Sequence, residues 1–186
     1  MQLDFQVDTK SFTTLNAAPA MVNKAISRAV TRVLDSMRTE LTQRTATRYY
    51  ITSTEIRKSI TARSYTAGDI RHGILTAKGL RIPLAKFKIS PKSPSFRMKG
   101  KPYQAAVKRE GGLKTLAPNA FYVPSKKQAF RRIAPGGRGF RNLRVLMGPA
   151  VPQMLKNEQT LKEVTDKAEE VFKQRFNHEI ERLLFA

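Results

Sequence analysis

The residues that could transfer protons or bind a metal are two histidines and a few carboxylates near them. Asp69 and His72 stand three positions apart, and on a helix a carboxylate at this spacing could orient an imidazole. They lie in a segment that is predicted to be a strand or turn, so we interpret them as a surface pair. His178 precedes Glu179 and Glu181 on a predicted helix, and no third ligand follows at a metal-binding spacing. We therefore predict neither a proton-transfer site nor a metal site.

The sequence also offers few residues for nucleophilic catalysis and no complete phosphate-loop motif. The chain has no cysteine, which removes thiol catalysis, disulfides and thiolate-bound zinc. The glycine-rich run at 136–139 lacks the Gly-Lys-Ser/Thr ending and the following helix of a phosphate loop, so we interpret it as a hairpin tip. Most carboxylates lie away from the basic centre, which makes a two-carboxylate hydrolase site hard to assemble. We expect that the chain is not an enzyme and holds no cofactor and no metal.

Positive charge is concentrated in the middle of the chain. Of the formal net charge of +21, residues 57–144 contribute +20, with 22 Lys and Arg against Asp69 and Glu110. The first 56 residues carry 7 bases and 5 acids, and the residues after 144 carry 6 bases and 7 acids. Such a centre favours a polyanionic partner, or neighbouring subunits that share the charge around one.

Two clusters of Lys and Arg are the candidate contacts to DNA, to another polyanion or to a neighbouring subunit. One lies in the Pro-, Ser- and Lys-rich segment 90–101, and the other flanks the glycine-rich turn at 134–141; both segments are predicted to be mobile loops. Cations on loops suit phosphate contacts, which position a protein without reading sequence. No zinc-finger spacing, RNP-like motif or KH-type loop is visible, so sequence-specific recognition is not predicted. The candidate contact residues are Lys92, Arg97, Lys99, Lys101, Lys126, Lys127, Arg131, Arg132, Arg138 and Arg141.

Two long segments of helical periodicity flank this centre, at 17–50 and 151–186, with a short helix predicted at 53–60. A helix of about 30 residues is about 45 Å long, more than a compact domain of this size needs. We interpret most of each apolar stripe as covering a sheet, and expect the surplus length to pack against other subunits. Glu163 stands four residues before Lys167, which predicts an ion pair within the second helix. The residues assigned to subunit packing are Val22, Ile26, Val33, Met37, Leu41, Phe172, Phe176 and Ile180.

Short alternating apolar runs predict strands at the N-terminus and between residues 61 and 148. Ile74-Leu75 and the run at 80–89 read as a hairpin around Lys78-Gly79. We predict an α+β fold in which an antiparallel, strongly basic β-sheet packs with a long N-terminal and a long C-terminal helix, as one domain over 1–186. Within it we expect an N-terminal strand or arm at 1–16, helices at 17–60, the basic β region at 61–148 and the C-terminal helix at 151–186.

Composition sets the broad class of the protein. Forty per cent of the 186 residues are hydrophobic, which is enough for a folded core despite the charge. No run approaches the 18 apolar residues that indicate a transmembrane helix, so no membrane association is predicted. The first ten residues alternate and contain acids, unlike a signal peptide. We expect a soluble protein that is made in a cytoplasm.

Several short motifs follow one another in a distinctive order. The helix AMVNKAISRAV precedes STEIRKSI, then RIPLAKF, Asn119-Ala120-Phe121, Phe130-Arg131-Arg132 and finally LRVLMGPAVPQML at 143–155. Over about residues 17–160 this series resembles the phage and prophage minor tail protein Z family, the tail completion proteins. The chain departs from that pattern at 143–145, where the family commonly has Leu-Pro-Ile, and at Ala150, where Ser is frequent.

The resemblance implies a structural virion protein at the neck, the head-proximal end of the tail, that completes the tail and helps join it to the head. It implies a homo-oligomeric ring, hexameric if it follows tail symmetry, assembled in the bacterial host cytoplasm. The implied neighbours are tail terminator, tube and neck proteins, with genomic DNA or the tape-measure protein in the channel. Gly148, Pro149 and Pro152 would turn the chain into the last helix. The alternative is a non-specific nucleic-acid-binding protein of the ribosomal or nucleoid kind.

Overall fold

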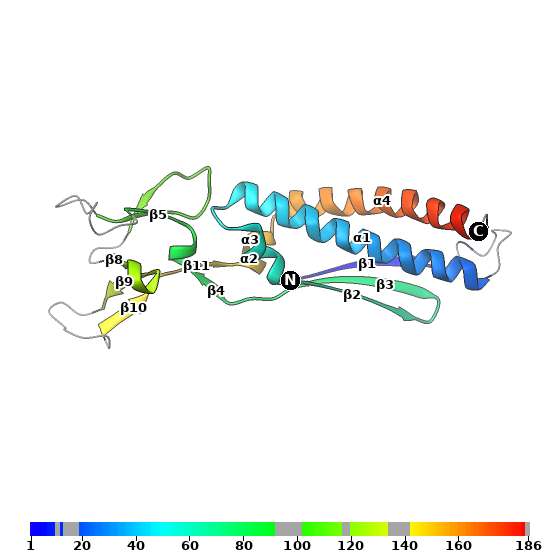
Figure 1. Ribbon diagram of the computed structural model, residues 1–186, viewed down its shortest axis with the longest axis horizontal. Coiled ribbons are helices and arrows are strands. Elements are labelled where there is room, and N and C mark those ends of the chain that lie inside the picture. The colour runs from blue at the N-terminus through cyan, green and yellow to red at the C-terminus, as the bar shows by residue number, and fades with distance from the viewer. Residues whose placement is uncertain (10–11, 13–18, 92–101, 117–119, 134–141, 185–186) are drawn as a thin grey trace.

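The fold is α+β, with antiparallel strand pairs and a long helix near each end of the chain, as predicted. This computed structural model describes residues 1–9, 12, 19–91, 102–116, 120–133 and 142–184. The molecule is elongated: two long helices lie side by side over one sheet, and smaller sheets occupy the opposite end (Figure 1). The segments predicted to be mobile loops, 90–101 and 134–141, lie outside the described residues except for Ser90 and Pro91.

The helices occur where the apolar periodicity predicts them, with one exception at the C-terminal end. The first long helix starts at a proline, which suits a first turn because the N–H groups there have no partner within the helix. Its last residue is tied to the rest of the chain, since the Arg48 carbonyl accepts from the Arg109 amide at 2.8 Å. The helices are α1 (Pro19–Arg48), α2 (Ser53–Lys58), α3 (Val151–Leu155) and α4 (Glu158–Leu184), and the 3-10 turns are η2 (Leu84–Lys86) and η4 (Pro124–Lys126).

The predicted single helix at 151–186 is wrong, because the chain breaks between α3 and α4. Asn157 accepts hydrogen bonds through its Oδ1 atom from the Thr160 amide at 2.9 Å and from the Thr160 hydroxyl at 3.0 Å. An asparagine that caps the third residue of the next helix takes a non-helical position itself. α3 is therefore a separate turn that docks Met154 and Leu155 into the core.

The strands form four small antiparallel sheets instead of one. The largest has the order β1-β3-β2 and lies under the long helices; the others have the orders β10-β9-β8, β5-β6-β7 and β11-β4. The strands are β1 (Gln2–Asp8), β2 (Ile60–Ala67), β3 (Ile70–Ala77), β4 (Arg81–Pro83), β5 (Lys88–Ser90), β6 (Gln104–Ala106), β7 (Lys114–Thr115), β8 (Ala120–Val123), β9 (Gln128–Arg132), β10 (Leu143–Val145) and β11 (Met147–Ala150).

The predicted hairpin around Lys78-Gly79 is wrong. β3 pairs on one side with β1 and on the other with β2, whereas β4 pairs with β11. The hairpin turn lies instead between β2 and β3, where Gly68 has a φ of +59°. That left-handed conformation suits glycine, so Gly68-Asp69 is the turn and residues 78–80 lead from the first sheet to the next.

The apolar stripes of α1 and α4 are buried within the chain itself. All eight residues that we assigned to subunit packing are at most 9% exposed, so the assignment is corrected: their side chains already contact α1, α4 or the β1-β3-β2 sheet. A buried side chain has no surface left to offer a second subunit. These residues are Val22, Ile26, Val33, Met37, Leu41, Phe172, Phe176 and Ile180.

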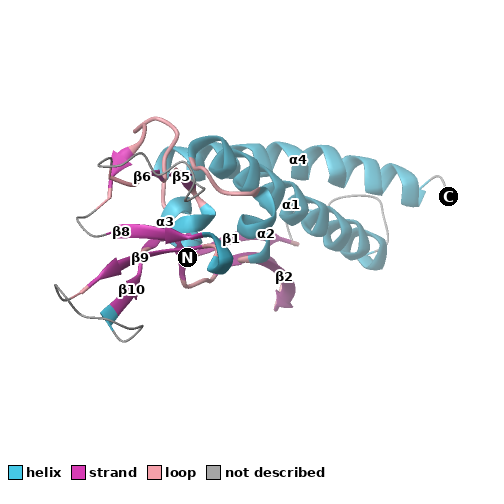
Figure 2. Cartoon of the chain, turned by 60° about the vertical axis from the view of Figure 1, so that its left-hand side comes forward, coloured by secondary structure: helices cyan, strands magenta, loops and turns pink. Residues whose placement is uncertain are grey.

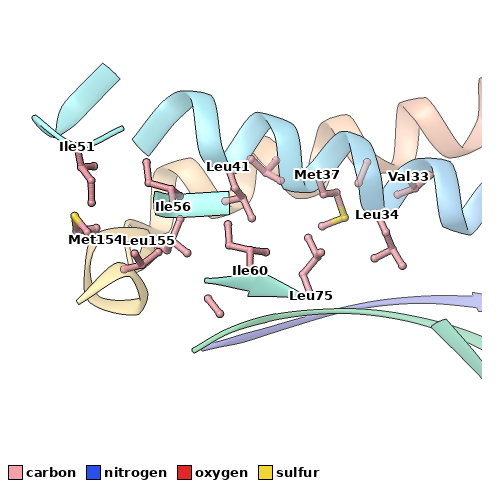
Figure 3. Close-up of a cluster of buried hydrophobic side chains, with 14 of the residues drawn as sticks. Val33, Leu34, Met37, Leu41, Ile51, Ile56, Ile60, Leu75, Met154 and Leu155 are labelled. Carbon is pink, nitrogen blue, oxygen red and sulfur yellow. The ribbon is translucent and has the colours of Figure 1, made fainter. Parts of the chain in front are cut away.

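The core is continuous from the helices to the middle of the molecule. Leu41 of α1 is 2% exposed and lies beside Ile56 and Ile60, which are 0% and 1% exposed (Figure 3). Leu75 of β3 and Leu155 of α3 belong to the same cluster. Residues from α1, α2, β2, β3 and α3 therefore fold around one apolar centre, which fixes the position of the β strands that follow.

Glycine allows two close contacts in this core. A Cβ atom on Gly73 of β3 would lie 3.0 Å from Val30 Cγ1 and 3.2 Å from Leu34 Cδ2, both on α1. A glycine within a strand often marks such an approach, because no side chain separates the two backbones. Gly73 thus lets α1 lie directly on the sheet.

Gly148→Ala is expected to lower the free energy of unfolding by about 1–3 kcal/mol, as overpacking of a core usually does. A Cβ atom at Gly148 would lie 2.6 Å from Cε2 of the Phe87 ring, and that ring is only 4% exposed. Chemical denaturation measures the change. The control is Gly111→Ala, where a new Cβ atom meets only the end of the Lys114 side chain at 3.9 Å. Equal stability of the two variants would contradict the close packing of the Phe87 ring on Gly148.

Ion pairs join α1 to α4 beside the apolar contact. Glu40 accepts from Lys167 Nζ and from Arg44 Nε, both at 2.7 Å, and Arg44 also pairs with Glu163. Near the other end of the pair, Arg28 lies 3.1 Å from Glu179. Glu163 and Lys167, expected to pair with each other, instead reach across to α1. Cross-helix partners are preferred because α4 lies against α1 along its length (Figure 1).

The stability that Glu40 contributes is expected to depend on pH. Hydrogen bonds from Lys167 and Arg44 hold the pKa of Glu40 below its usual value. A lowered carboxyl pKa stabilises the fold fully above the unfolded-state pKa of about 4.3 and loses that effect as pH falls through the folded-state value. The stability gap between the wild-type protein and Glu40→Gln should therefore shrink below about pH 4. Urea denaturation between pH 3 and pH 7 checks this, with Asp35→Asn on the same helix as control; a constant gap would refute it.

Candidate polyanion-binding surface

Charge divides the molecule into two parts. We call residues 81–150 the basic end, and residues 1–80 with 151–186 the body. The basic end has 17 Lys and Arg against one acid, Glu110, for +16, while the body has 18 bases and 13 acids, for +5. Figure 2 shows β8, β9 and β10 at the end of the molecule away from the C-terminus. Among the described residues, the basic end carries 11 bases and one acid and the body carries 17 bases and 13 acids, so the formal charge of the described part is concentrated at one end of an elongated molecule.

Two arginines face each other across strands β9 and β10. Arg131 pairs in register with Arg144, so both side chains leave the sheet on the same face, and both are exposed. Among the described residues neither arginine forms an ion pair with a carboxylate. Like charges directly opposite each other destabilise a sheet. Two positive charges that the described fold does not neutralise are a suitable contact for an external anion.

The turn between β8 and β9 carries two more cations at its tip. The 3-10 turn η4 ends at Lys126, and Lys127 follows with a φ of 46° while its amide donates to the Pro124 carbonyl at 3.1 Å. It is the one described residue other than glycine with a positive φ. This left-handed conformation is unfavourable for residues other than Gly, Asn and Asp. The fold therefore presents an exposed lysine at a strained position of the tip.

Arg131 and Arg132 do not act on the same surface. Adjacent residues of a strand point to opposite faces, so Arg132 lies on the face of Phe121 and Phe130. Its guanidinium carbon is 5.5 Å from the centre of the Phe121 ring, which itself stacks on Phe130 at 6.0 Å. The structure thus brings Arg131 together with Arg144, on the other side of the glycine-rich turn, and separates it from Arg132.

A second group of cations surrounds an aromatic ring at the junction of body and basic end. Lys88 Nζ lies 5.1 Å from the centre of the Tyr50 ring, and the Arg109 guanidinium lies 4.8 Å from it. Arg109 also donates to the Ala46 carbonyl at 3.2 Å, which anchors it to the end of α1. We did not predict this group from the sequence, because its members lie far apart along the chain.

The six remaining candidate contact residues lie outside the described residues. They are Lys92, Arg97, Lys99, Lys101, Arg138 and Arg141. Their roles stay predictions from the sequence. The four candidates that the structure places, all at the β8-β9 hairpin, are Lys126, Lys127, Arg131 and Arg132.

The two histidines have separate surroundings in the part of the chain that the structure describes. His72 stacks on Tyr65 with 4.9 Å between ring centres, and its Nδ1 atom lies 3.5 Å from the Asp4 carboxylate. His178 is exposed on α4. The described residues contain no group of three or more His, Cys, Asp or Glu side chains suited to a metal ion.

No described helix is long and apolar enough to cross a membrane. No protein-family model, curated protein or solved structure matches the chain.

Proposed function

We propose that this protein is a structural subunit of a phage or prophage particle, forming a ring at the head-proximal end of the tail. The order of motifs from residue 17 to residue 160 supports this proposal. The observation that carries it is the separation of charge along an elongated molecule, where the described residues carry +10 within 81–150 and +4 in the rest. A ring would gather the basic ends of all copies around one axis.

The basic end would face an anionic neighbour. A field of this size needs DNA or an acidic protein surface close by, because like charges at the same rim repel one another. Arg131 and Arg144 supply the clearest contact, since nothing in the described part of the chain neutralises them. The body would hold the copies in place, and the basic end would join the ring to DNA in the channel or to the next ring.

A non-specific nucleic-acid-binding protein is the second candidate. The observation that favours it is the Tyr50 ring between Lys88 and Arg109, since aromatic rings and cations together bind nucleic acid without reading its sequence. Such a protein would remain a monomer when bound to DNA. Size measurement at high salt, with and without duplex DNA, distinguishes a monomer from an assembled ring.

Deletion of the gene in the phage or prophage that encodes it tests the proposal. We expect heads and tails that are each complete but unjoined in electron micrographs, and a loss of infectivity that expression of the wild-type chain restores. A charge-reversed chain with Lys126, Lys127, Arg131 and Arg132 changed to glutamate should fail to restore it. Normal joined particles in the deletion strain would contradict the proposal.

A further inference from the structure

The β1-β3-β2 sheet has two long open edges. Within the described residues no strand pairs with the outer side of β1 or the outer side of β2. These strands have 7 and 8 residues and are the longest in the molecule apart from β3. An open edge presents a row of N–H and C=O groups that can hydrogen-bond to a further strand.

A groove of about 430 Å³ runs along the open edge of β1, between that strand and α4. Its apolar floor contains Phe5, Phe12 and Phe172, and the rings of Phe5 and Phe172 are 5.7 Å apart. Polar side chains form its rim, including Asp4 and Gln6. A strand that paired with β1 would place alternate side chains over this floor and the others over the outer face of the sheet.

We propose that the open edge of β2 from a second copy of this chain pairs with β1 along this groove. This inference rests on the proposed function, which requires a ring, and names the surfaces that would join neighbouring copies. The helix-facing side chains of β2 beyond Ile60 are small: Ala62, Ser64 and Thr66. Small side chains fit a shallow groove beside aromatic rings.

Charge and register agree with this pairing. β1 carries Asp4 and Asp8 and no base, whereas β2 carries Arg63 and no acid. Asp4 and Arg63 lie in the same row of the sheet, because both are opposite Ile74 of β3. If the sheet continues in register into the next copy, the neighbour's arginine at this position lies beside Asp4, an oppositely charged cross-strand pair.

The same charges disfavour the symmetric alternatives. Two β1 edges would bring acids together, and two β2 edges would place arginines near each other. Pairing of β1 with β2 is head-to-tail, and such contacts form rings when the rotation between copies closes.

The different widths of the sheet layer and the helix layer determine the direction in which successive copies rotate. Three strands span about 14 Å, whereas two packed helices need about 18 Å. A repeat whose helical layer is wider than its sheet layer curves toward the sheet. The sheets would therefore face the axis of the ring, and the basic ends would project along it, since β1, β2 and β3 run along the long dimension of the molecule (Figure 1).

Engineered disulfides test the pairing cleanly, because the chain has no cysteine of its own. Gln2 and Thr61 are exposed and share the row opposite Thr76. Within one chain they are two strand spacings apart, about 10 Å, which is beyond the reach of about 7 Å for a disulfide between Cα atoms. Any disulfide between these positions therefore joins two copies.

We expect a disulfide-linked dimer when Gln2→Cys and Thr61→Cys chains are mixed under oxidising conditions, and none from either variant alone. A mixture of Thr61→Cys with Glu170→Cys, an exposed site on α4, is the matched control. The double variant Gln2→Cys/Thr61→Cys should give a ladder of linked copies in purified particles. Its largest linked species would report the number of copies in the ring.

Charge exchange in the same disulfide assay supplies a second test of the pairing. Asp4→Arg or Arg63→Asp alone should lower the yield of the mixed disulfide about fivefold, and Asp4→Arg/Arg63→Asp together in each chain should restore it. Dimers from a single cysteine variant, or no linkage either in concentrated solution or in particles, would overturn the inference. If the disulfide forms in solution but the protein is absent from phage particles, the pairing would be supported and the proposed tail role refuted.

Discussion

Replacement of Arg131 and Arg144 by glutamine is expected to weaken binding to duplex DNA about 100-fold at about 0.1 M salt. Each phosphate contact releases about 0.9 of a counterion, so two lost contacts lower the slope of log K against log salt by about 1.8. The two arginines are opposite each other on β9 and β10, and among the described residues they have no carboxylate partner. Each side chain can therefore meet a phosphate group of its own on the same duplex.

The same variant should keep its stability, which separates a binding role from a structural one. Removal of a like-charge cross-strand pair is expected to leave the free energy of unfolding unchanged or raise it by up to about 1 kcal/mol. Lys24→Gln/Arg32→Gln makes an equal change in net charge at exposed positions of α1 in the body. Fluorescence anisotropy over a salt series measures both variants. Equal losses of affinity would show that only net charge matters, and would contradict a localised surface.

Leu41→Ala is expected to lower the free energy of unfolding by about 2–5 kcal/mol. Leu41 is 2% exposed and lies beside Ile56 and Ile60 where α1, α2 and β2 meet. Truncation there leaves a cavity that the surrounding side chains fill only in part. For a chain of this size each kcal/mol corresponds to about 2–4 °C in Tm.

Leu80→Ala is the matched control, because Leu80 is 92% exposed and its truncation should change stability by less than about 0.5 kcal/mol. Denaturation at a protein concentration low enough to keep the chain monomeric distinguishes the two roles of Leu41. If Leu41 packed against another subunit, the monomer would keep its stability and only assembly would weaken. That outcome would support the prediction from the sequence that Leu41 packs against another subunit.

Much of the helical part of the fold could be predicted from the sequence. The spacing of Val22, Ile26, Val33 and Leu41 predicts a long helix with one buried face, and α1 has it. Periodicity does not identify the surface that a stripe covers, however. A helix of about 45 Å looked too long for one domain, yet α4 and the β1-β3-β2 sheet cover it within the same chain.

The strand pairings could not be predicted from local pattern alone. β3 is followed closely by β4 in sequence, but β4 pairs with β11, more than 60 residues later. The signal for the actual hairpin is Gly68-Asp69, a turn pair that adopts a left-handed conformation at its glycine. Likewise the break at Asn157 has a local signal, an asparagine followed by Glu158 at a helix start.

The residue types of the candidate surface could be predicted from the sequence, but their arrangement in space could not. Net charge assigns it to the centre of the sequence, because any fold must put that many cations on a surface. Arg131 and Arg132 were grouped as neighbours in sequence, whereas strand alternation sends them to opposite faces and brings Arg144 to Arg131 instead. The Tyr50 group depends on contacts between the segment after α1, strand β5 and the segment after β6, which no local pattern contains.

A cryo-electron-microscopy reconstruction of particles that contain this chain tests the proposed role most directly. We expect a closed ring at the head-proximal end of the tail, with residues 81–150 of each copy against DNA or the adjacent ring, and with β1 of each copy beside β2 of the next. Absence of the chain from the particle would contradict the tail role. A ring whose basic ends all point into solvent would contradict the polyanion-binding surface.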